Sequence, residues 1–442
     1  MQVSDITSSA ESQEALDIQT TASNDRLVVA HFMLGNTYPF TEADWQKTFT
    51  LAFDTALDGF ALNLGPEPWQ LAQAHSAFNV LERQPPQARP FKMFLSMDMN
   101  VLAAATTADA QNLLGTVGGL LKRKAYLRFR GQLLLSTFAG HDKTFGGWGW
   151  QGFLDRLNGS IGEKVLFIPS FFMPPNDFIG LPYVDGCYAW NNAWPQDNRT
   201  TDLSQDQPFL QSDKLYMAAV SPLFFTHYGT SGQWAFNKNW IYRSDDLLLP
   251  TRFAQLMSLP ADRAPEIIQV ISWNDYGESH HIAPVLGAEP GSQAWTANLS
   301  HEAFRLMVRY FANRWRSDSV PEVDSRLIVW AWYRTHPASA NASNDPVGRP
   351  AHAEWAVDQI NLLILVPASM TCSSVTVKNG GRVNVKPLYP GRANSIMVPF
   401  IPGSVSFEIP KPDGKIWVGQ GVPINERPNL YNFNMWGGSW GY

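Results

Sequence analysis

The chain has few cysteines, no cluster of basic residues and no long apolar run, and each absence excludes a class of protein. Only Cys187 and Cys372 occur among the 442 residues, so we expect two free, buried thiols rather than a disulfide framework. A formal charge of −6 without a basic run argues against nucleic acid or an anionic membrane as a partner. Because no apolar stretch reaches about 18 residues, the sequence predicts no transmembrane helix.

The N-terminal segment lacks the features of a secretory signal. It contains neither a basic n-region nor an apolar h-region, and Ser, Thr, Gln and acidic residues are frequent in it. We therefore expect residues 1–25 to form a disordered polar leader. The localisation stays open, either intracellular or secreted by a route that this sequence does not reveal.

Aromatic residues, in contrast, are abundant. The chain contains 17 Trp and 26 Phe, more than a core of this size ordinarily needs. Aromatic rings on a surface are typical of ligand contact, and sugars present flat apolar C–H faces that stack on such rings. A chain of 442 residues is also long for a single core, which predicts two domains.

Short apolar runs recur along the first two thirds of the chain, and most are separated by helix-like stretches. One such stretch spans 41–53 with Thr41 as its N-cap, and the last spans 301–315, whereas the fifth unit leaves room for a single helical turn. Strands that alternate with helices imply a parallel sheet, and eight such units predict a (β/α)₈ TIM barrel over residues 26–320. The eight predicted strands lie at 27–33, 59–64, 91–98, 132–138, 164–169, 184–190, 214–220 and 267–273.

After about residue 320 the pattern changes to apolar residues at every second position with turn sequences between the runs. AsnGlyGly at 379–381 and ProAspGly at 412–414 separate alternating segments, which is typical of β-hairpins. We expect residues 321–442 to form an antiparallel, β-sandwich-like accessory domain. This domain could bind carbohydrate or act as a structural lid beside the barrel, and the sequence leaves both open.

The segment from Ile267 to His281 is the most informative part of the chain. A buried β-branched run ends in Trp273 and Asn274, and two carboxylates, Asp275 and Glu278, follow. Catalytic groups lie at the C-terminal ends of barrel strands, and two acids beside aromatic rings suit glycoside hydrolysis. The alternative is a helix-capping Asp with a surface Glu, which the preceding strand and the nearby aromatics disfavour.

Several segments resemble the fungal α-1,3-glucanases, or mutanases, of glycoside hydrolase family 71. The resemblance rests on ValValAlaHisPheMetLeuGlyAsnThrTyr, AspGlyPheAlaLeuAsn, SerMetAspMetAsn and TrpAsnAspTyrGlyGluSerHisHis, which occur in family order. It implies inverting hydrolysis of α-1,3-glucan, a polymer of fungal cell walls, without a metal or an organic cofactor. It also implies that Asp275, Glu278 and Asp98 are the essential acids.

The residues suggest a division of roles. Inversion requires an acid and a base roughly 6.5–9.5 Å apart, so that water fits between the base and the sugar. Glu278 reaches further and is the expected general acid, with a pKa raised by burial against rings such as Trp273, and Asp275 is the expected base. Asp98 at the end of the third strand could polarise the water, bind a sugar hydroxyl or keep a partner protonated by like-charge repulsion. Its structural alternative is a salt bridge within the barrel. Expected substrate-binding residues are His31, Asn63, Trp148, Trp150, Tyr188, Trp190, His227, Tyr228 and Trp273.

Other classes of protein fit the sequence less well. A metal-dependent barrel hydrolase would need a chelating pair, but His31 is alone, and His280 and His281 are neighbours whose side chains point apart. A sugar-phosphate enzyme would need a Gly-rich anion loop, of which GlyThrSerGly at 229–232 is the only trace. A hydrolase of another polysaccharide and a non-catalytic glycan-binding protein remain the alternatives. We expect a monomer that acts on a polysaccharide; endo or exo action is not readable.

Overall fold

The computed structural model describes residues 26–87, 89–316, 326–370 and 374–441. The predicted leader, Cys372 and the predicted domain boundary near residue 320 lie outside the described residues, so these three predictions stay predictions. Cys187 is a buried free thiol, as expected. Among the described helices, none has the length and apolar character that crossing a membrane requires.

Eight parallel strands in the described part of the chain form the barrel that the sequence predicts, one in each of the eight predicted runs. They are β1 (Leu27–Met33), β2 (Gly59–Leu64), β3 (Lys92–Asp98), β5 (Gln132–Phe138), β6 (Leu166–Phe167), β7 (Gly186–Tyr188), β8 (Leu215–Val220) and β11 (Ile267–Val270). Their order is β6-β5-β3-β2-β1-β11-β8-β7, and the short β4 (Arg128–Phe129) pairs antiparallel with β5. The backbone N–H groups of Asp185 and Tyr188 donate to the carbonyls of Phe167 and Pro169, both at 2.9 Å, which joins β7 to β6.

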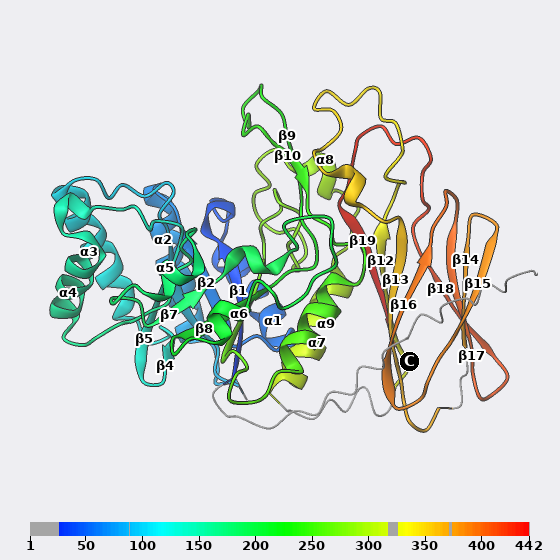
Figure 1. The fold of residues 1–442 in the computed structure, drawn as a ribbon, viewed down its shortest axis with the longest axis horizontal. Helices are drawn as coiled ribbons and strands as arrows, with labels where there is room; N and C mark the ends of the chain where they lie inside the picture. Colours follow the sequence, from blue (N-terminus) through cyan, green and yellow to red (C-terminus); the bar gives the residue numbers. More distant parts are fainter. Residues whose placement is uncertain (1–25, 88, 317–325, 371–373, 442) are drawn as a thin grey trace, which may run out of the picture.

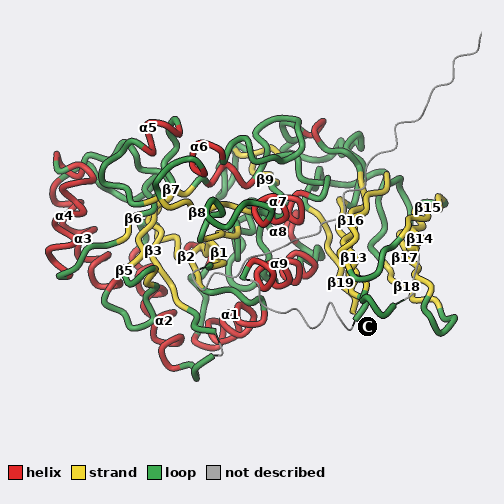
Figure 2. The backbone as a smooth tube through the Cα atoms, turned by 60° about the horizontal axis from the view of Figure 1, so that its bottom comes forward, coloured by secondary structure: helices red, strands yellow, loops and turns green. Residues whose placement is uncertain are grey.

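The helices follow their strands and cover the barrel (Figures 1 and 2). Thr41 caps the first helix as predicted, because its hydroxyl and the Asp44 side chain form a capping box. The fifth unit holds only one short helix, α5, also as expected. The helices are α1 (Glu42–Asp54), α2 (Pro68–Arg83), α3 (Thr107–Leu121), α4 (Gly149–Ile161), α5 (Pro175–Ile179), α6 (Gln207–Leu210), α7 (Leu248–Met257), α8 (Gln293–Thr296) and α9 (Glu302–Trp315).

A hairpin that the sequence did not predict is inserted between β8 and α7. Its strands β9 (Phe225–Tyr228) and β10 (Lys238–Ile241) pair antiparallel, with Lys238 opposite Tyr228. Figure 1 shows the loop between them projecting from the barrel. This hairpin brings a lysine from the loop after β8 to the groups that follow β11.

Two antiparallel sheets follow the barrel, as the sequence predicts. The turn between β14 and β15 consists of Gly380 and Gly381, whose φ angles of +52° and +87° explain why glycine occupies both positions. One sheet has the order β16-β13-β12-β19 and the other β15-β14-β17-β18. Their strands are β12 (Ile328–Arg334), β13 (Gln359–Val366), β14 (Ser374–Asn379), β15 (Arg382–Pro387), β16 (Arg392–Pro399), β17 (Val405–Pro410), β18 (Ile416–Gln420) and β19 (Met435–Gly441).

The first of these sheets is buried on both faces. On β12, Trp330 and Trp332 pack into the core of the barrel, while Val329 and Tyr333 pack into the core between the two sheets. Successive side chains of a strand point to opposite faces, so one strand serves both cores. Figure 1 shows β19 and β12 beside α9, which makes this sheet the side of the β region that faces the barrel.

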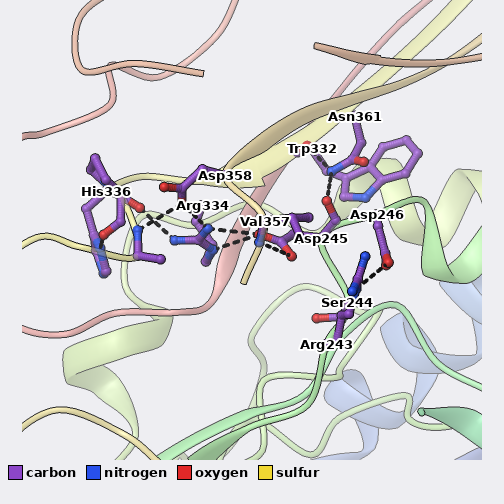
Figure 3. A network of polar contacts seen from close by, with 12 residues as sticks. Arg243, Ser244, Asp245, Asp246, Trp332, Arg334, His336, Val357, Asp358 and Asn361 are labelled. Atoms are coloured by element: carbon purple, nitrogen blue, oxygen red, sulfur yellow. Dashed lines mark hydrogen bonds and ion pairs between the residues drawn. The ribbon is translucent and has the colours of Figure 1, made fainter. Parts of the chain in front are cut away.

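A buried ionic network connects the barrel to this sheet (Figure 3). Arg334 at the end of β12 donates from Nε and Nη2 to Oδ2 of Asp245 at 3.1 and 2.8 Å, and it also pairs with Asp358. Asp245 lies between β10 and α7, and it accepts the backbone N–H of Val357 at 3.1 Å. The backbone carbonyl of His336 accepts from Nη1 of Arg334 at 2.9 Å. Each polar group is held from several directions, which fixes the β region against the barrel.

Candidate active site

The loop after β11 is fixed to the end of β1 by backbone and amide bonds. The N–H of Trp273 donates to the carbonyl of His31 at 2.7 Å. The side chain of Asn274 accepts the N–H of Met33 at 2.7 Å and donates to the carbonyl of the same residue at 3.1 Å. The residue that follows, Asp275, is thereby fixed at the C-terminal mouth of the barrel.

Two carboxylates and a histidine meet on this loop. One oxygen of Asp275, one of Glu278 and one ring nitrogen of His280 all lie within 4.8 Å of one another. Oε2 of Glu278 lies 3.1 Å from Nε2 of His280, and Oε1 accepts from Nζ of Lys238 on β10 at 3.2 Å. Both carboxylates are partly exposed, so a substrate can reach them.

His280 is oriented by a hydroxyl and enclosed by rings. Its Nδ1 lies 3.0 Å from Oγ of Ser272, and the same oxygen accepts the N–H of Asp275 at 2.8 Å. Since Nε2 donates to the carboxylate of Glu278, a neutral His280 accepts at Nδ1 from this hydroxyl. The rings of Trp194, Phe224 and Trp190 surround it, with centroids at 5.6, 5.8 and 6.3 Å. Ser272 thus connects the backbone of Asp275 to the carboxylate of Glu278 through His280.

The electrostatic environment separates the two carboxylates. Burial raises the pKa of Asp275 to about 6, and repulsion by Glu278 adds to the effect. Burial acts in the same direction on Glu278, but the hydrogen bond from His280 and the charge of Lys238 outweigh it and lower the pKa. The expectation of a raised pKa for Glu278 is therefore wrong: the raised value belongs to Asp275.

The separation of the two carboxyl groups bears on the stereochemistry of the reaction. Inversion ordinarily needs roughly 6.5–9.5 Å between them, whereas retaining enzymes have about 5–5.5 Å. One oxygen of Asp275 and one of Glu278 lie within 4.8 Å of each other, and the predicted wide separation of the carboxyl groups stays a prediction.

Asp98 belongs to the same electrostatic environment. It ends β3, is partly buried, and accepts the N–H of Asn100 at 3.2 Å. Burial raises its pKa to about 6, against the opposing effects of Lys238 and of a hydrogen bond from Asn63. The ammonium of Lys238 thus acts on Asp98 as well as on Asp275 and Glu278. One lysine therefore lowers the pKa values of three carboxylates, one at the end of β3 and two in the loop after β11.

Four of the expected substrate-binding residues lie around this cluster. Asn63 bonds Asp98, and the ring of Trp190 lies between His31 at 4.7 Å and His280. Burial lowers the pKa of His31 to about 3, so its ring is neutral. The hydroxyl of Tyr228 donates to the carbonyl of Pro290 at 2.8 Å and lies beside Gly277 of the loop after β11.

Of the two tryptophans of the Gly-rich loop, Trp150 does not have the free ring that the sequence predicts, whereas Trp148 is partly exposed and its role in substrate binding stays a prediction. Trp150 is only 3% exposed, donates from Nε1 to the carbonyl of Gly140 at 2.7 Å, and packs against Phe145 in the core. The guanidinium of Arg156 covers Trp148 at 4.1 Å from the ring centroid. Since α4 begins within this loop, the sequence forms a helix start in place of a stacking platform.

Three further residues serve the fold rather than an open cleft. Trp273 is buried against Phe60, with ring centroids 5.1 Å apart, and Tyr188 is almost fully buried. Both ring nitrogens of His227 are engaged, one by Asn239 at 2.8 Å and the other by Asp345 at 2.9 Å. Their assignment to substrate binding is corrected accordingly, because the rings and nitrogens are already occupied by the protein.

Lys238, His280 and Ser272 were missed as contributors to the site. His280 and Ser272 lie within the segment from Ile267 to His281, where two adjacent histidines suggest a poor chelating pair and give no sign of a hydrogen bond to Glu278. Lys238 is 40 positions from Glu278, and only the unpredicted hairpin brings the two together. The sequence indicates the contribution of Lys238 only weakly, through a lysine in a segment of alternating polar and apolar residues after a barrel strand.

The cluster offers ligand atoms for a metal, but its charges favour acid–base chemistry. Asp275, Glu278 and His280 present three ligand atoms close together. The ammonium of Lys238 already provides the positive charge for Glu278, and a divalent cation there would be repelled by it. An acid with a raised pKa beside an ionised carboxylate is the arrangement that glycosidases use to cleave an acetal bond.

A barrel with such a pair at its mouth defines the class of glycoside hydrolases, and comparison with known proteins gives the family. Residues 24–441 match the model of glycosyl hydrolase family 71, and the chain belongs to this family. It is 32% identical to a glucan endo-1,3-alpha-glucosidase of Schizosaccharomyces pombe over 94% of both chains. It is 29% identical to an ascus wall endo-1,3-alpha-glucanase of the same organism, over 94% of this chain and 98% of the relative. It is 28% identical to a mutanase of Penicillium rubens, over 96% and 91%.

Proposed function

We propose that the protein is an endo-acting hydrolase of α-1,3-glucan. The substrate follows from the names of the three relatives, each of which is similar to this chain over nearly its whole length. The observation that carries the chemistry is the pair Asp275 and Glu278, whose pKa values move in opposite directions within one small cluster. A carboxyl that keeps its proton beside one that loses it supplies both halves of acid–base catalysis.

In this proposal Asp275 is the general acid and Glu278 the general base, the reverse of the assignment made from the sequence. Asp275 protonates the glucosidic oxygen as the bond from C1 to that oxygen breaks. Glu278 takes a proton from the water whose oxygen bonds to C1. The reason for the reversal is that Lys238 and His280 stabilise the ionised form of Glu278, whereas Asp275 is protonated more readily.

Lys238 and His280 act here as positioning residues. They bond different oxygens of Glu278, at 3.2 and 3.1 Å, and so fix the plane of the carboxylate as well as its charge. Ser272 orients His280 from the other side. Asp98, which shares the influence of Lys238, is proposed to bind a sugar hydroxyl or the attacking water.

Inversion is the stereochemistry that the family resemblance implies, and we propose it for this protein. It predicts a β-anomer as the first product. Inversion requires space for a water molecule between the base and the sugar, so we expect the two carboxyl groups to lie roughly 6.5–9.5 Å apart when the glucan is bound. An α-anomer as the first product would replace this part of the proposal by a retaining reaction with Glu278 as nucleophile.

The test is incubation with insoluble α-1,3-glucan, β-1,3-glucan and starch, with product analysis and NMR of the first anomer formed. Soluble oligosaccharides from α-1,3-glucan alone are expected. Release from β-1,3-glucan or starch instead would assign the site to another polysaccharide. Binding without release of any product would favour a glycan-binding protein.

The roles of the two acids are separated by a substrate that needs no acid. Fluoride leaves without protonation, so a short α-1,3-glucooligosaccharyl fluoride bypasses the general acid. Asp275→Asn is expected to hydrolyse this fluoride while losing activity on glucan, and Glu278→Gln is expected to lose both. The opposite pattern would restore the assignment made from the sequence.

A further inference from the structure

A row of aromatic rings leads from the catalytic loop to the tip of the β9–β10 hairpin. It begins at Tyr228, which packs on Gly277 between the two catalytic carboxylates; a Cβ at this glycine would meet the tyrosine hydroxyl at 2.5 Å. The ring of Phe236 lies 4.8 Å from that of Tyr228, and the ring of Trp234 lies 6.0 Å from that of Phe236. The three rings connect the site of bond cleavage to the most exposed part of the hairpin.

The two outer rings are exposed although the fold supports them. Phe236 is 52% exposed and Trp234 is 38% exposed. Trp234 rests on Gly291, where a Cβ would come within 2.7 Å of the indole Cδ1. Support from one side and exposure on the other is the condition for stacking, since contiguous exposed aromatic surface is typical of binding sites.

The hairpin also fixes where these rings lie relative to the chemistry. Lys238, two residues beyond Phe236, bonds Glu278 and pairs in register with Tyr228. A glucan bound at Asp275 and Glu278 can therefore extend along the hairpin, where its flat C–H faces would stack on the aromatic rings. Val383 and Val385 are also exposed, but they lie on β15 in the β region rather than on the hairpin.

We propose that Trp234 and Phe236 form a distal subsite that stacks glucosyl residues of an α-1,3-glucan chain beyond the bond that is cleaved. The proposal rests on the proposed function and deepens it: affinity for polymer comes from the hairpin tip, and bond cleavage from the loop after β11. Its ligand is a neutral glucan of several residues rather than a mono- or disaccharide.

Binding is tested in the Glu278→Gln background, so that turnover does not consume the polymer. The fraction of protein that sediments with insoluble α-1,3-glucan is measured for Trp234→Ala with Phe236→Ala. Removal of both rings is expected to weaken binding about tenfold, which corresponds to about 1.4 kcal/mol. The matched control is Tyr389→Ala in the β region, where the ring is 45% exposed and lies against Arg392. This control is expected to sediment like the parent protein.

Catalysis provides an independent readout in the otherwise unchanged enzyme. The kcat/KM of the parent enzyme should rise with the length of soluble α-1,3-glucooligosaccharides, and the double variant should lose most of this rise. A variant that carries Trp234→Phe in place of Trp234→Ala keeps a ring and should recover part of the rise in kcat/KM with substrate length. A misfolded hairpin tip would not recover it. Equal length dependence and equal sedimentation in the parent and the double variant would overturn the subsite while leaving the proposed function intact. If the parent enzyme neither binds nor cleaves α-1,3-glucan, the proposed function fails, and the subsite fails with it.

Discussion

The carboxylate cluster at the barrel mouth and the Asp245–Arg334 network between the barrel and the β region both bury charge, but they satisfy it differently. Arg334 is held by two carboxylates and a carbonyl, and its pKa is raised although burial opposes this. At the mouth, one half-exposed Lys238 serves three carboxylates, and two of them, Asp98 and Asp275, have pKa values raised to about 6. The several partners of Arg334 fix the β region against the barrel. The carboxylates at the mouth are desolvated by burial and share the charge of Lys238, so Asp98 and Asp275 keep a proton more readily, and such a proton can be transferred.

The largest expected effect is on catalysis. Glu278→Gln and Asp275→Asn should each lower the hydrolysis of α-1,3-glucan at least about a hundredfold, because proton transfer is worth roughly 10²–10⁴. The measurement is reducing-end release with circular dichroism as a check of folding. Near-normal turnover by either folded variant would remove that residue from the mechanism and leave the fold untouched.

Breaking the network should act on stability instead. Arg334→Leu leaves Asp245 buried without its guanidinium, and loss of one partner of a buried pair costs about 3–5 kcal/mol. Chemical denaturation measures this loss. The control is Lys378→Met, because the exposed pair with Glu408 on the second sheet is worth at most about 1 kcal/mol. Equal losses in the two variants would show that burial does not distinguish the pairs.

Replacing Asp275, the proposed general acid, should raise stability rather than lower it. Folded protein holds the proton of Asp275 up to about pH 6, whereas an unfolded Asp releases it near its ordinary pKa of 3.8. Stability therefore falls as the pH rises between these values and stays lower above them. Asp275→Asn removes this cost, so its melting temperature at pH 7 should exceed that of the parent by a few degrees, with little difference at pH 3.5. A lower melting temperature at pH 7 would contradict the raised pKa.

The pH dependence of kcat/KM tests how the charge of Lys238 affects the proposed acid and base. The acid must be protonated, so activity should fall as the pH rises through about 6, the pKa of Asp275. Lys238 lowers the pKa of Glu278, so Lys238→Met should move the acidic limb of the profile to higher pH. Lys238→Arg keeps the charge and should restore the limb. An unmoved acidic limb in Lys238→Met would assign that limb to another group.

The eight parallel strands of the barrel and the two sheets of the β region were predictable, because each depends on a local pattern, whereas the β9–β10 hairpin was not. The run at 267–273 is short, β-branched and buried, and the two-glycine turn at 380–381 needs positive φ angles that the sequence itself suggests. The site was predictable only in part. Asp275 and Glu278 are neighbours in sequence, but their relative pKa values depend on Lys238, which arrives through a hairpin 40 positions away.

The burial of individual tryptophans was also not predictable from the local sequence. Trp150 and Trp234 both lie in glycine-containing loops after barrel strands, and composition alone does not separate them. Packing does: α4 begins at Gly149 and draws Trp150 into the core, whereas the hairpin carries Trp234 outward. Which ring is buried is decided by tertiary contacts that local patterns do not contain.

The smallest expected effect follows from this correction. Trp148 lies under the guanidinium of Arg156, which is about two turns further along α4. Trp148→Leu should lose the cation–π contact, about 0.5–1 kcal/mol of stability, together with part of the packing of this partly buried ring against the core. Its kcat and KM on α-1,3-glucan should stay within about twofold of the parent, as is usual for substitutions away from a site. Trp190→Leu is the comparison, because Trp190 packs between His31 and His280, and its loss should lower kcat through the orientation of Glu278. If Trp148→Leu raised KM as much as removal of the hairpin rings, the glucan would have to cross the α4 side of the barrel, and the path along the hairpin would be wrong.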